Sequence, residues 1–133
     1  MKKAVIYYSG TGNTQTMAEK IAEVSGAQLF TFDEFKPHDI AAYDAVALGC
    51  PAMGAEVLEE EIVQPAFDEI KPLLKGKRVA LFGSYGWGDG EWMRNWEDDC
   101  RAAGAELLCE SVICNEAPDD DALQACENLG KAM

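Results

Sequence analysis

Five short apolar runs alternate with stretches of helical periodicity, and this alternation limits the fold of the chain more than any other feature. The runs are residues 3–8, 28–32, 45–49, 77–83 and 106–114. Such alternation is the pattern of β-α-β units, whose strands join in a parallel sheet. The third run is apolar at almost every position, as in a strand buried on both faces. We therefore expect an α/β fold with five strands, formed by residues 1–133 as one domain.

The segments between the runs have the spacing of amphipathic helices. They are residues 14–24, 57–70, 91–103 and 120–132. We expect Asn13 or Thr14 to cap the first helix and Gly26 to close it. Pro65 lies inside the second, so that helix is expected to start, bend or restart near it. The acidic triplet at 119–121 is explained as the start of the last helix.

Charge and cysteine content exclude several classes of protein. The chain has 24 acidic and 11 basic residues and a net charge of −13, which disfavours nucleic acid and favours basic partners. Its five cysteines are odd in number and show no Cys-x-x-Cys spacing, so neither a zinc site nor a closed disulfide framework is indicated. With no segment of signal-peptide or transmembrane pattern, we expect a cytoplasmic protein that does not bind membranes.

Three loops that follow the first, third and fourth predicted strands have an unusual composition. In an open parallel sheet such loops line the ligand crevice. They are Ser9, Gly10, Thr11, Gly12, Asn13 and Thr14; Cys50, Pro51, Ala52, Met53, Gly54, Ala55 and Glu56; and Ser84, Tyr85, Gly86, Trp87, Gly88, Asp89 and Gly90. None of the three contains Lys or Arg.

The first loop has the composition of a phosphate site. Its hydroxyl groups and backbone N–H groups precede a predicted helix, where an anion is favoured. It lacks the third glycine of the dinucleotide fingerprint and the Gly-Lys-Ser/Thr ending of a triphosphate loop. Without a lysine, the expected ligand is a monophosphate held by neutral donors. The alternative interpretation is an ordinary capped turn.

The other two loops carry groups suited to a flat ligand. Trp87 stands between glycines, where its indole can stack on a ring, although a loop tryptophan that covers the sheet edge is the alternative. Met53 offers a polarisable surface, Gly54 a peptide that can rotate, and Glu56 a carboxylate that accepts a ring N–H. Together with the phosphate loop, these residues predict a ring-containing monophosphate.

Four other conspicuous residues are assigned to structure. Trp92 and Trp96 lie four apart on a predicted helix, so we expect them to pack in the core. His38 is the only histidine and lies in a predicted surface turn. Cys50 is expected to be a small packing residue.

The three loops, in this order and spacing, resemble those of the flavodoxins, specifically the short-chain type of anaerobes, over essentially the whole chain. The fifth run supports the short form because it is uninterrupted, whereas long-chain flavodoxins carry an insertion in the last strand. The resemblance implies a three-layer, doubly wound parallel sheet of strand order 2-1-3-4-5. It also implies FMN as a non-covalent cofactor.

The resemblance assigns roles to individual residues. The side chains that hold the FMN phosphate are Ser9, Thr11, Asn13 and Thr14. Met53 and Trp87 flank the isoalloxazine, Glu56 accepts from ring N3–H, and Gly54 turns its carbonyl towards N5 when the semiquinone forms. The third loop gives backbone contacts to the pyrimidine end of the ring.

Two positions depart from the family pattern. Pro51 stands where some relatives have a hydroxyl residue, so one phosphate hydrogen bond is expected to be missing. Ala55 replaces a polar or acidic residue, which slightly changes the charge around the flavin.

The predicted function is a low-potential one-electron carrier, not an enzyme, because no general base, nucleophile or metal cluster accompanies the loops. Carboxylates around the crevice would make the anionic reduced flavin costly; these are Glu56, Glu59, Glu60, Glu61 and Asp89. We expect a monomer that docks on basic surfaces of reductases, oxidoreductases or hydrogenase-type proteins. The alternative is an FMN-dependent NAD(P)H:quinone-type reductase, which needs a second pocket and usually a longer chain.

Overall fold

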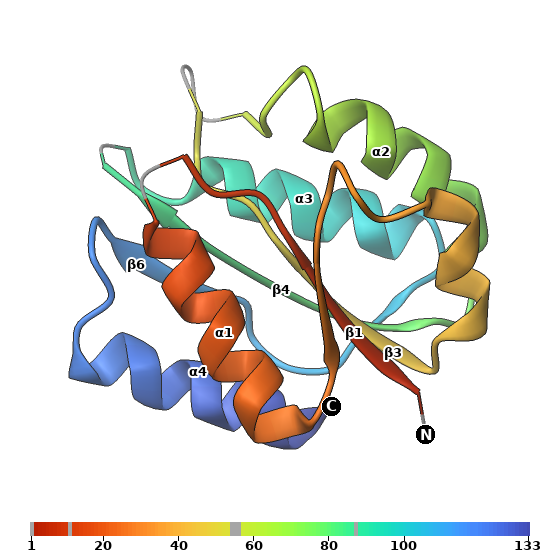
Figure 1. Ribbon diagram of the computed structural model, residues 1–133. Coiled ribbons are helices and arrows are strands. Elements are labelled where there is room, and N and C mark those ends of the chain that lie inside the picture. The colour runs from red at the N-terminus through yellow and green to blue at the C-terminus, as the bar shows by residue number, and fades with distance from the viewer. Residues whose placement is uncertain (1, 11, 54–56, 87) are drawn as a thin grey trace.

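A twisted parallel sheet forms the centre of the computed structural model, which describes residues 2–10, 12–53, 57–86 and 88–133 (Figure 1). Its strands are β1 (Lys3–Tyr7), β2 (Gln28–Thr31), β3 (Ala45–Gly49), β4 (Arg78–Tyr85), β5 (Glu106–Leu107) and β6 (Val112–Asn115). The order is β2-β1-β3-β4-β5, with β6 also paired to β4, and all these pairs are parallel. The α/β fold and the strand order 2-1-3-4-5 are confirmed.

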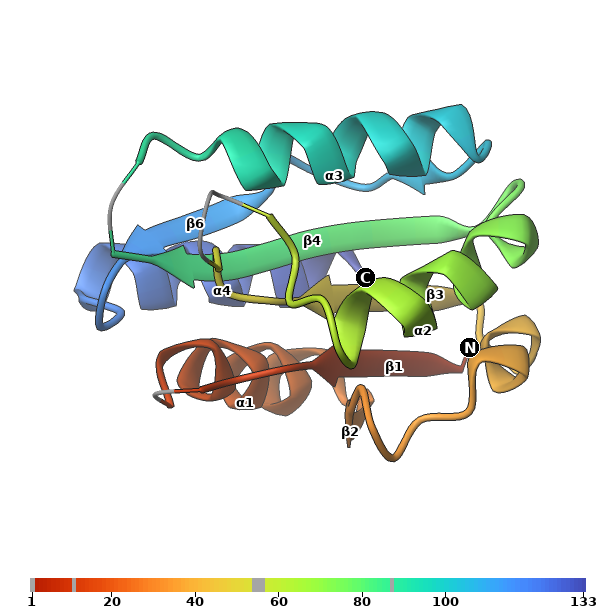
Figure 2. The same cartoon turned by 90° about the horizontal axis from the view of Figure 1, so that it is seen from above.

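Helices cover both faces of the sheet (Figure 2). They are α1 (Asn13–Ser25), α2 (Val63–Ile70), α3 (Glu91–Ala102) and α4 (Asp120–Ala132), with short 3-10 helices η1 (Pro37–Ala42) and η2 (Lys71–Leu73). Gly26 ends α1 at φ 74° and donates its N–H to Ala22, as predicted. The Asp119 carboxylate caps α4 by accepting from Ala122, which confirms the predicted helix start. Within the described part of the chain, no helix has the length and apolar character needed to cross a membrane.

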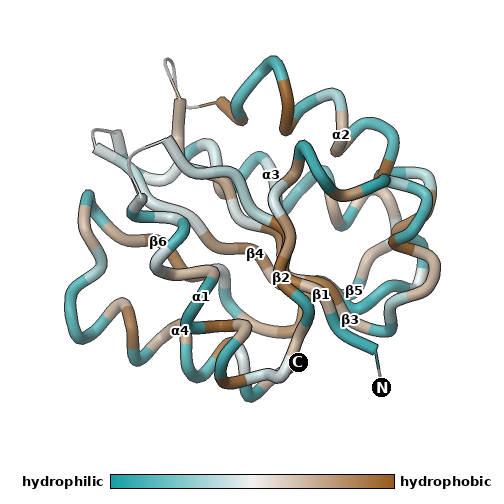
Figure 3. Tube along the Cα trace, viewed as in Figure 1, coloured by the Kyte–Doolittle hydropathy of each residue, from teal (hydrophilic) through white to brown (hydrophobic). Residues whose placement is uncertain are grey.

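Two cores lie on opposite faces of the sheet because side chains along a strand point alternately to either face. Ala4 and Ile6 of β1 face α2 and α3, whereas Val5 between them faces α1 and α4. All of β3 is buried, as its apolar composition predicts. Along the Cα trace, hydrophobic residues gather in the central strands, whereas the helices carry both hydrophilic and hydrophobic residues (Figure 3).

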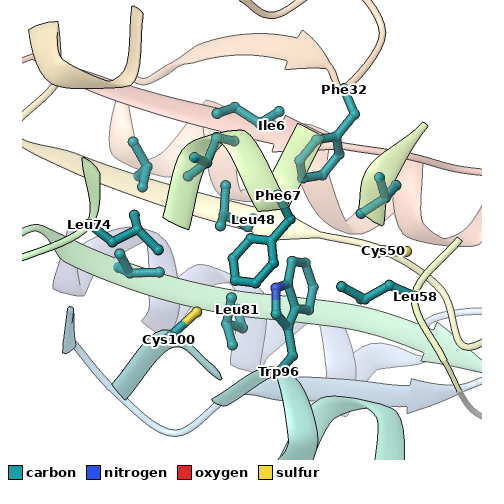
Figure 4. Packing of buried hydrophobic residues seen from close by; sticks show 14 of the residues in the cluster. Ile6, Phe32, Leu48, Cys50, Leu58, Phe67, Leu74, Leu81, Trp96 and Cys100 are labelled. Atoms are coloured by element: carbon teal, nitrogen blue, oxygen red, sulfur yellow. The ribbon is translucent and has the colours of Figure 1, made fainter. Parts of the chain in front are cut away.

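Aromatic side chains fill the core between the sheet, α2 and α3 (Figure 4). Phe67 of α2 meets Trp96 of α3 edge to face, with ring centroids 5.9 Å apart. Trp92 and Trp96 are each 1% exposed, which confirms that they pack in the core. These contacts fix α2 and α3 on the sheet and thereby place the segments at the ends of β3 and β4.

The fifth strand position is interrupted, so the prediction of one unbroken strand over 106–114 is wrong. Arg78 of β4 pairs with Glu106, but Phe82 pairs with Val112. Between these two pairs, β4 advances by four residues, from 78 to 82, whereas its partner advances by six, from 106 to 112. The two additional residues of the partner bulge out of the ladder. The Ser111 hydroxyl donates to the Glu97 carboxylate at 2.6 Å, which ties the bulge to α3.

Candidate functional site

A cleft of about 710 Å³ lies beyond the carboxyl ends of β1, β3, β4 and β6, which all point to the same end of the sheet in Figure 2. Its described lining residues are Gly10, Asn13, Pro51, Ala52, Met53, Ser84, Tyr85, Gly86, Glu116 and Ala117. Residues from all three predicted loops therefore meet in one cleft. Five predicted residues lie outside the part of the chain that the structure describes: Thr11, Gly54, Ala55, Glu56 and Trp87.

The hydroxyl loop, residues 9–14, is held by short-range hydrogen bonds. Ser9 Oγ accepts from the N–H of Gly12 at 3.0 Å, and the Gly12 carbonyl accepts from the N–H of Thr16 at 3.0 Å. Gly12 is the N-cap of α1 at φ 96°, a conformation that favours glycine. The prediction that Asn13 or Thr14 caps this helix is therefore wrong, because both residues already lie in its first turn.

The start of α1 offers neutral donors to the cleft. Gly10 and Asn13 line the cleft, and the first turn of the helix has no acidic residue to oppose an anion. Thr14 is 1% exposed, and its Oγ1 lies 2.9 Å from Ser84 Oγ. This bond joins the hydroxyl loop to the end of β4. An anion near Gly10 and Asn13 would thus meet the positive end of the α1 dipole.

Ser84 and Tyr85 belong to β4, although the sequence predicted the strand to end at residue 83. Ser84 is buried, and the Tyr85 ring packs against Trp92 with centroids 5.6 Å apart. Their place in a strand holds both residues more firmly than a loop would. Gly86, exposed and next along the chain, also lines the cleft.

The β3–α2 connection, residues 50–62, begins by continuing the sheet. Cys50 donates its N–H to Phe82 at 3.2 Å, and Ala52 donates to Ser84 at 2.9 Å. The Cys50 carbonyl accepts from Trp92 Nε1 at 3.1 Å. A Cβ on Gly83 would lie 2.2 Å from that carbonyl oxygen, so only glycine permits this close approach.

Farther along, Met53 and Val57 pair as an antiparallel bridge. The N–H of each donates to the carbonyl of the other, at 3.0 and 3.1 Å. The helix predicted over 57–70 therefore begins only at Val63, because the residues before it form this bridge and a turn. Pro65 lies in the first turn of α2, where a helix tolerates proline, so of the three expected outcomes near Pro65 (start, bend or restart) the structure shows a helix start.

Glu59 does not lie among the cleft residues as an exposed carboxylate. It is 7% exposed, and its carboxylate accepts three backbone N–H groups of the turn before α2. Burial alone raises its pKa, but the bonds from Val63, Glu61 and Ile62 outweigh burial and hold the pKa below its usual value. Glu60 and Glu61 are exposed, so the three consecutive glutamates differ in their environments.

Cys50 is fully buried, as expected of a packing residue. Burial raises the pKa of its thiol to about 12, while the nearby backbone N–H of Glu59 lowers it by a smaller amount. The thiol is therefore neutral at ordinary pH. His38 is exposed in η1, as predicted, and is remote from the cleft residues in sequence and fold.

Two features at or near the cleft were not predicted from the sequence. Glu116 and Ala117 line it from the turn after β6, where Glu116 donates its N–H to Tyr85 at 2.7 Å and adopts φ 58°. Their place after a strand end was a usable signal, because the other loops were found by that rule. Arg94 reaches back from α3 to Asp89 at 3.0 Å, so a cation does adjoin the third loop.

Several predicted residues adjoin the cleft without being among its described lining. Ser9, Gly12 and Thr14 belong to the hydroxyl loop and take part in the bonds given above. Gly88 and Asp89 are exposed on the approach to α3. Among the described residues, no group of three His, Cys, Asp or Glu side chains is arranged to hold a metal ion.

Comparison with known proteins identifies the family of this chain. The flavodoxin family pattern matches residues 5–130. The chain is 44% identical to the flavodoxin of Megasphaera elsdenii, covering 96% of this chain and 95% of that protein. It is 43% identical to the flavodoxin of Clostridium beijerinckii, with 97% and 96% covered.

Solved structures agree with this assignment. The solution structure of two-electron reduced Megasphaera elsdenii flavodoxin superimposes with a TM-score of 0.90 at 42% identity, covering 98% of this chain and 96% of that one. An archaeal flavodoxin gives a TM-score of 0.86 at 27% identity, with 98% and 94% covered.

The cleft fits FMN, the cofactor of flavodoxins. Its volume lies in the range of small-ligand sites, roughly 300 to 1,000 Å³. Neutral donors and a helix N-terminus at one side suit a phosphate, and Pro51, Ala52 and Met53 give the other side an apolar wall. From its sequence, fold and cleft, the chain belongs to the flavodoxin family of FMN-binding electron carriers.

Proposed function

We propose that this protein binds FMN non-covalently in the cleft and carries one electron at a time, at low potential, between redox proteins. The observation that carries the proposal is the meeting of a neutral phosphate cradle and an apolar wall at one edge of the sheet. FMN, when bound, supplies the electron-carrying chemistry. The protein binds and orients it, limits its contact with water, and sets the charge around it.

The phosphate side is built from hydroxyl groups that keep a free proton. Ser9 Oγ accepts from Gly12, which leaves its own hydrogen to donate to a phosphate oxygen. Thr14 and Ser84 share one hydrogen bond, so one of the two hydroxyl hydrogens also stays available. Asn13 and the backbone at Gly10 add further donors. On the family pattern, Thr11 completes this group.

The ring side is proposed from the cleft wall and from the family pattern. Met53 and Trp87 would flank the isoalloxazine, with Glu56 accepting from ring N3–H and Gly54 presenting its peptide to N5. The remaining residues assigned to the cofactor site are Pro51, Ala52, Ala55, Ser84, Tyr85, Gly86, Gly88 and Asp89. Glu116 and Ala117 add a wall that lies across the cleft in the described structure.

Carboxylates near the cleft support both a low potential and docking on basic surfaces. Glu60, Glu61 and Glu116 are exposed, and the whole chain carries a charge of −13. Negative charge near the flavin opposes the addition of electrons. The same field attracts basic partners, so electron transfer to such partners should slow as salt is added. Asp89 contributes less because Arg94 pairs with it.

We further propose a monomer that works in a reducing compartment, the cytoplasm. All five cysteines are free thiols, and four of them are buried. The burial of these thiols gives each a pKa above the ordinary value. They therefore serve packing rather than disulfide chemistry in this account.

Titration of the apoprotein with FMN and with riboflavin tests where the phosphate lies. Asn13→Asp places a carboxylate at the start of α1 and should weaken FMN binding about tenfold through repulsion of the phosphate. Riboflavin, which has no phosphate, should bind both proteins alike. The control is Gln15→Glu, an exposed residue of the same turn with the same added charge. Equal losses for both ligands would contradict the phosphate assignment, and no FMN binding by the wild type would contradict the function.

A further inference from the structure

Residues 59, 60 and 61 are all glutamates, but their environments differ. Glu59 is 7% exposed, whereas the next two are exposed. A buried carboxylate is costly unless hydrogen bonds compensate for lost water. The position of Glu59 therefore needs a structural reason that its two neighbours do not.

The Glu59 carboxylate binds the backbone of the turn that follows it. Oε1 accepts from the N–H of Glu61 at 2.8 Å, and Oε2 accepts from Ile62 at 2.7 Å and Val63 at 3.0 Å. The Glu59 carbonyl accepts from Gln64 at 2.9 Å. The first N–H groups of a helix have no partner inside the helix, and α2 has no side-chain cap at Ile62. Glu59 supplies these missing acceptors.

The same residue adjoins the wall of the cleft. Two residues earlier, Val57 exchanges two hydrogen bonds with Met53, which lines the cleft. Leu58, which lies between Val57 and Glu59 in the chain, is buried in the core (Figure 4). The backbone N–H of Glu59 lies beside the Cys50 thiol. The chain after the bridge is thus fixed at Leu58 and Glu59. The chain before it is fixed by the bond from Ala52 to Ser84.

We propose that Glu59 is a positioning residue whose buried carboxylate holds the turn before α2 and so keeps Val57 paired with Met53 at the cleft wall. Its neighbours Glu60 and Glu61 act on the cleft only through their charge. The effect of Glu59 on the flavin rests on the proposed function. Its effect on the Met53–Val57 pair does not, and can be measured without FMN.

Glu59→Gln separates the hydrogen bonds from the charge when it is compared with Glu60→Gln. Both substitutions remove one negative charge from the same segment. In Glu59→Gln, the amide NH₂ faces at least one backbone N–H in either orientation, because both carboxylate oxygens accept. A buried donor without a partner is expensive, so the turn should open more often.

Amide hydrogen exchange of the apoprotein tests the positioning role directly. Glu59→Gln should speed exchange at Val57, Ile62 and Val63 by about tenfold or more, and Glu60→Gln by less than about twofold. If Glu59→Gln does not fold, Glu59→Asp serves, because it keeps the charge but draws the carboxylate back by one methylene. It should speed the same amides by a smaller factor. Exchange like the wild type in Glu59→Asp, or equal exchange in the two Gln variants, would overturn the proposal.

Flavin measurements on the holoprotein then test the consequence at the cleft. Glu59→Gln should weaken FMN binding by about tenfold. Glu59→Gln should also shift the flavin midpoint potentials by similar amounts at about 0.05 M and about 0.5 M NaCl. The shift caused by Glu60→Gln should become smaller at the higher salt concentration, because salt screens the electrostatic effect of a surface charge. A shift from Glu59→Gln that fades with salt like that of Glu60→Gln would overturn this step. Absence of FMN binding in the wild type would instead refute the proposed function and leave the exchange result standing.

Discussion

The hydroxyl loop and the β3–α2 connection both contribute residues to the cleft, but different contacts hold them. The hydroxyl loop is closed mainly by bonds between residues at most four apart, from Ser9 to Gly12 and from Gly12 to Thr16, with one long-range bond from Thr14 to Ser84. The β3–α2 connection has more long-range bonds at its start, where its first residues bond to β4 and to Trp92. Its end is closed locally by the buried Glu59 carboxylate, which accepts from residues two to four positions along the chain.

The two segments should therefore respond differently to substitution. A loop closed by local bonds tolerates change in the rest of the fold, but depends on a few backbone conformations of its own. A connection held by β4, α3 and a buried charge depends on the packing of the whole layer. We therefore expect substitutions to have larger effects in the β3–α2 connection and its supports than in the hydroxyl loop.

The largest effect is expected at Gly83, which supports the β3–α2 connection. A Cβ there would lie 2.2 Å from the Cys50 carbonyl oxygen and 3.2 Å from the Trp92 ring. Gly83→Ala should therefore lower the free energy of unfolding of the apoprotein by about 3 kcal/mol, measured in urea. The matched control is Gly10→Ala in the hydroxyl loop, where no atom lies within 4 Å. It should change stability by less than about 0.5 kcal/mol, and equal effects of the two would refute the comparison.

A smaller effect, dependent on pH, is expected at Glu59. Its pKa in the folded protein lies below the ordinary 4.5, so its contribution to stability is full above that value and is lost as pH falls through the folded pKa. Glu59→Gln should cost about 2 kcal/mol near neutral pH, because it breaks bonds to a buried charge. The difference from the wild type should vanish in acid. Urea unfolding from about pH 7 to about pH 3 measures it.

Glu60→Gln is the control for that series, because Glu60 is exposed and its removal should barely change stability at any pH. A Glu59→Gln penalty that stays constant below the ordinary carboxylate pKa would contradict the role of the ionised group.

Removing the hydrogen bond between Thr14 and Ser84 should have a moderate effect on the stability of the apoprotein. Thr14 and Ser84 are both buried and share one hydrogen bond of 2.9 Å. Thr14→Val and Ser84→Ala should each cost about 1.5 kcal/mol, because each leaves the other hydroxyl unpaired. The double variant should cost about 1 kcal/mol less than the sum of the two. Additive losses in a double-mutant cycle would mean that the two hydroxyl groups are not coupled.

The smallest effect is expected inside the hydroxyl loop itself. Gly12 caps α1 at φ 96°, where an alanine is strained. Gly12→Ala should cost about 1 kcal/mol of apoprotein stability by thermal unfolding. Gly86→Ala is the matched control in the cleft, because φ at Gly86 is not in the left-handed range and no atom lies within 4 Å. A loss of stability in Gly12→Ala as large as that in Gly83→Ala would contradict the expectation that the hydroxyl loop is the less sensitive segment.

The sequence predicts the parts of the fold that local patterns determine. Apolar runs locate the strands because each is buried on one or both faces, and β3 is the clearest case. Gly26 and Asp119 mark helix ends through backbone conformation and capping, which depend on few neighbours. Loops that follow parallel strands line the ligand crevice, and this rule predicts three of the four segments that supply described cleft residues.

The remaining features depend on burial and pairing in the folded chain, which no local pattern shows. Glu59 cannot be told from Glu60 and Glu61 by residue type, and only its burial gives it the role of an anchor. Ser84 and Tyr85 directly precede a glycine-rich segment, yet pairing with β6 keeps them in β4. Arg94 reaches Asp89 because the start of α3 turns the chain back.

The central claim is that the cleft holds FMN and that the protein carries electrons singly. Spectroelectrochemical titration of the FMN-loaded protein, in the absence of oxygen, tests it most directly. We expect reduction in two well-separated one-electron steps, the second at a lower potential than in free FMN, and no reduction by NAD(P)H alone. A single two-electron step, or direct reduction by NAD(P)H, would contradict the account and favour a reductase.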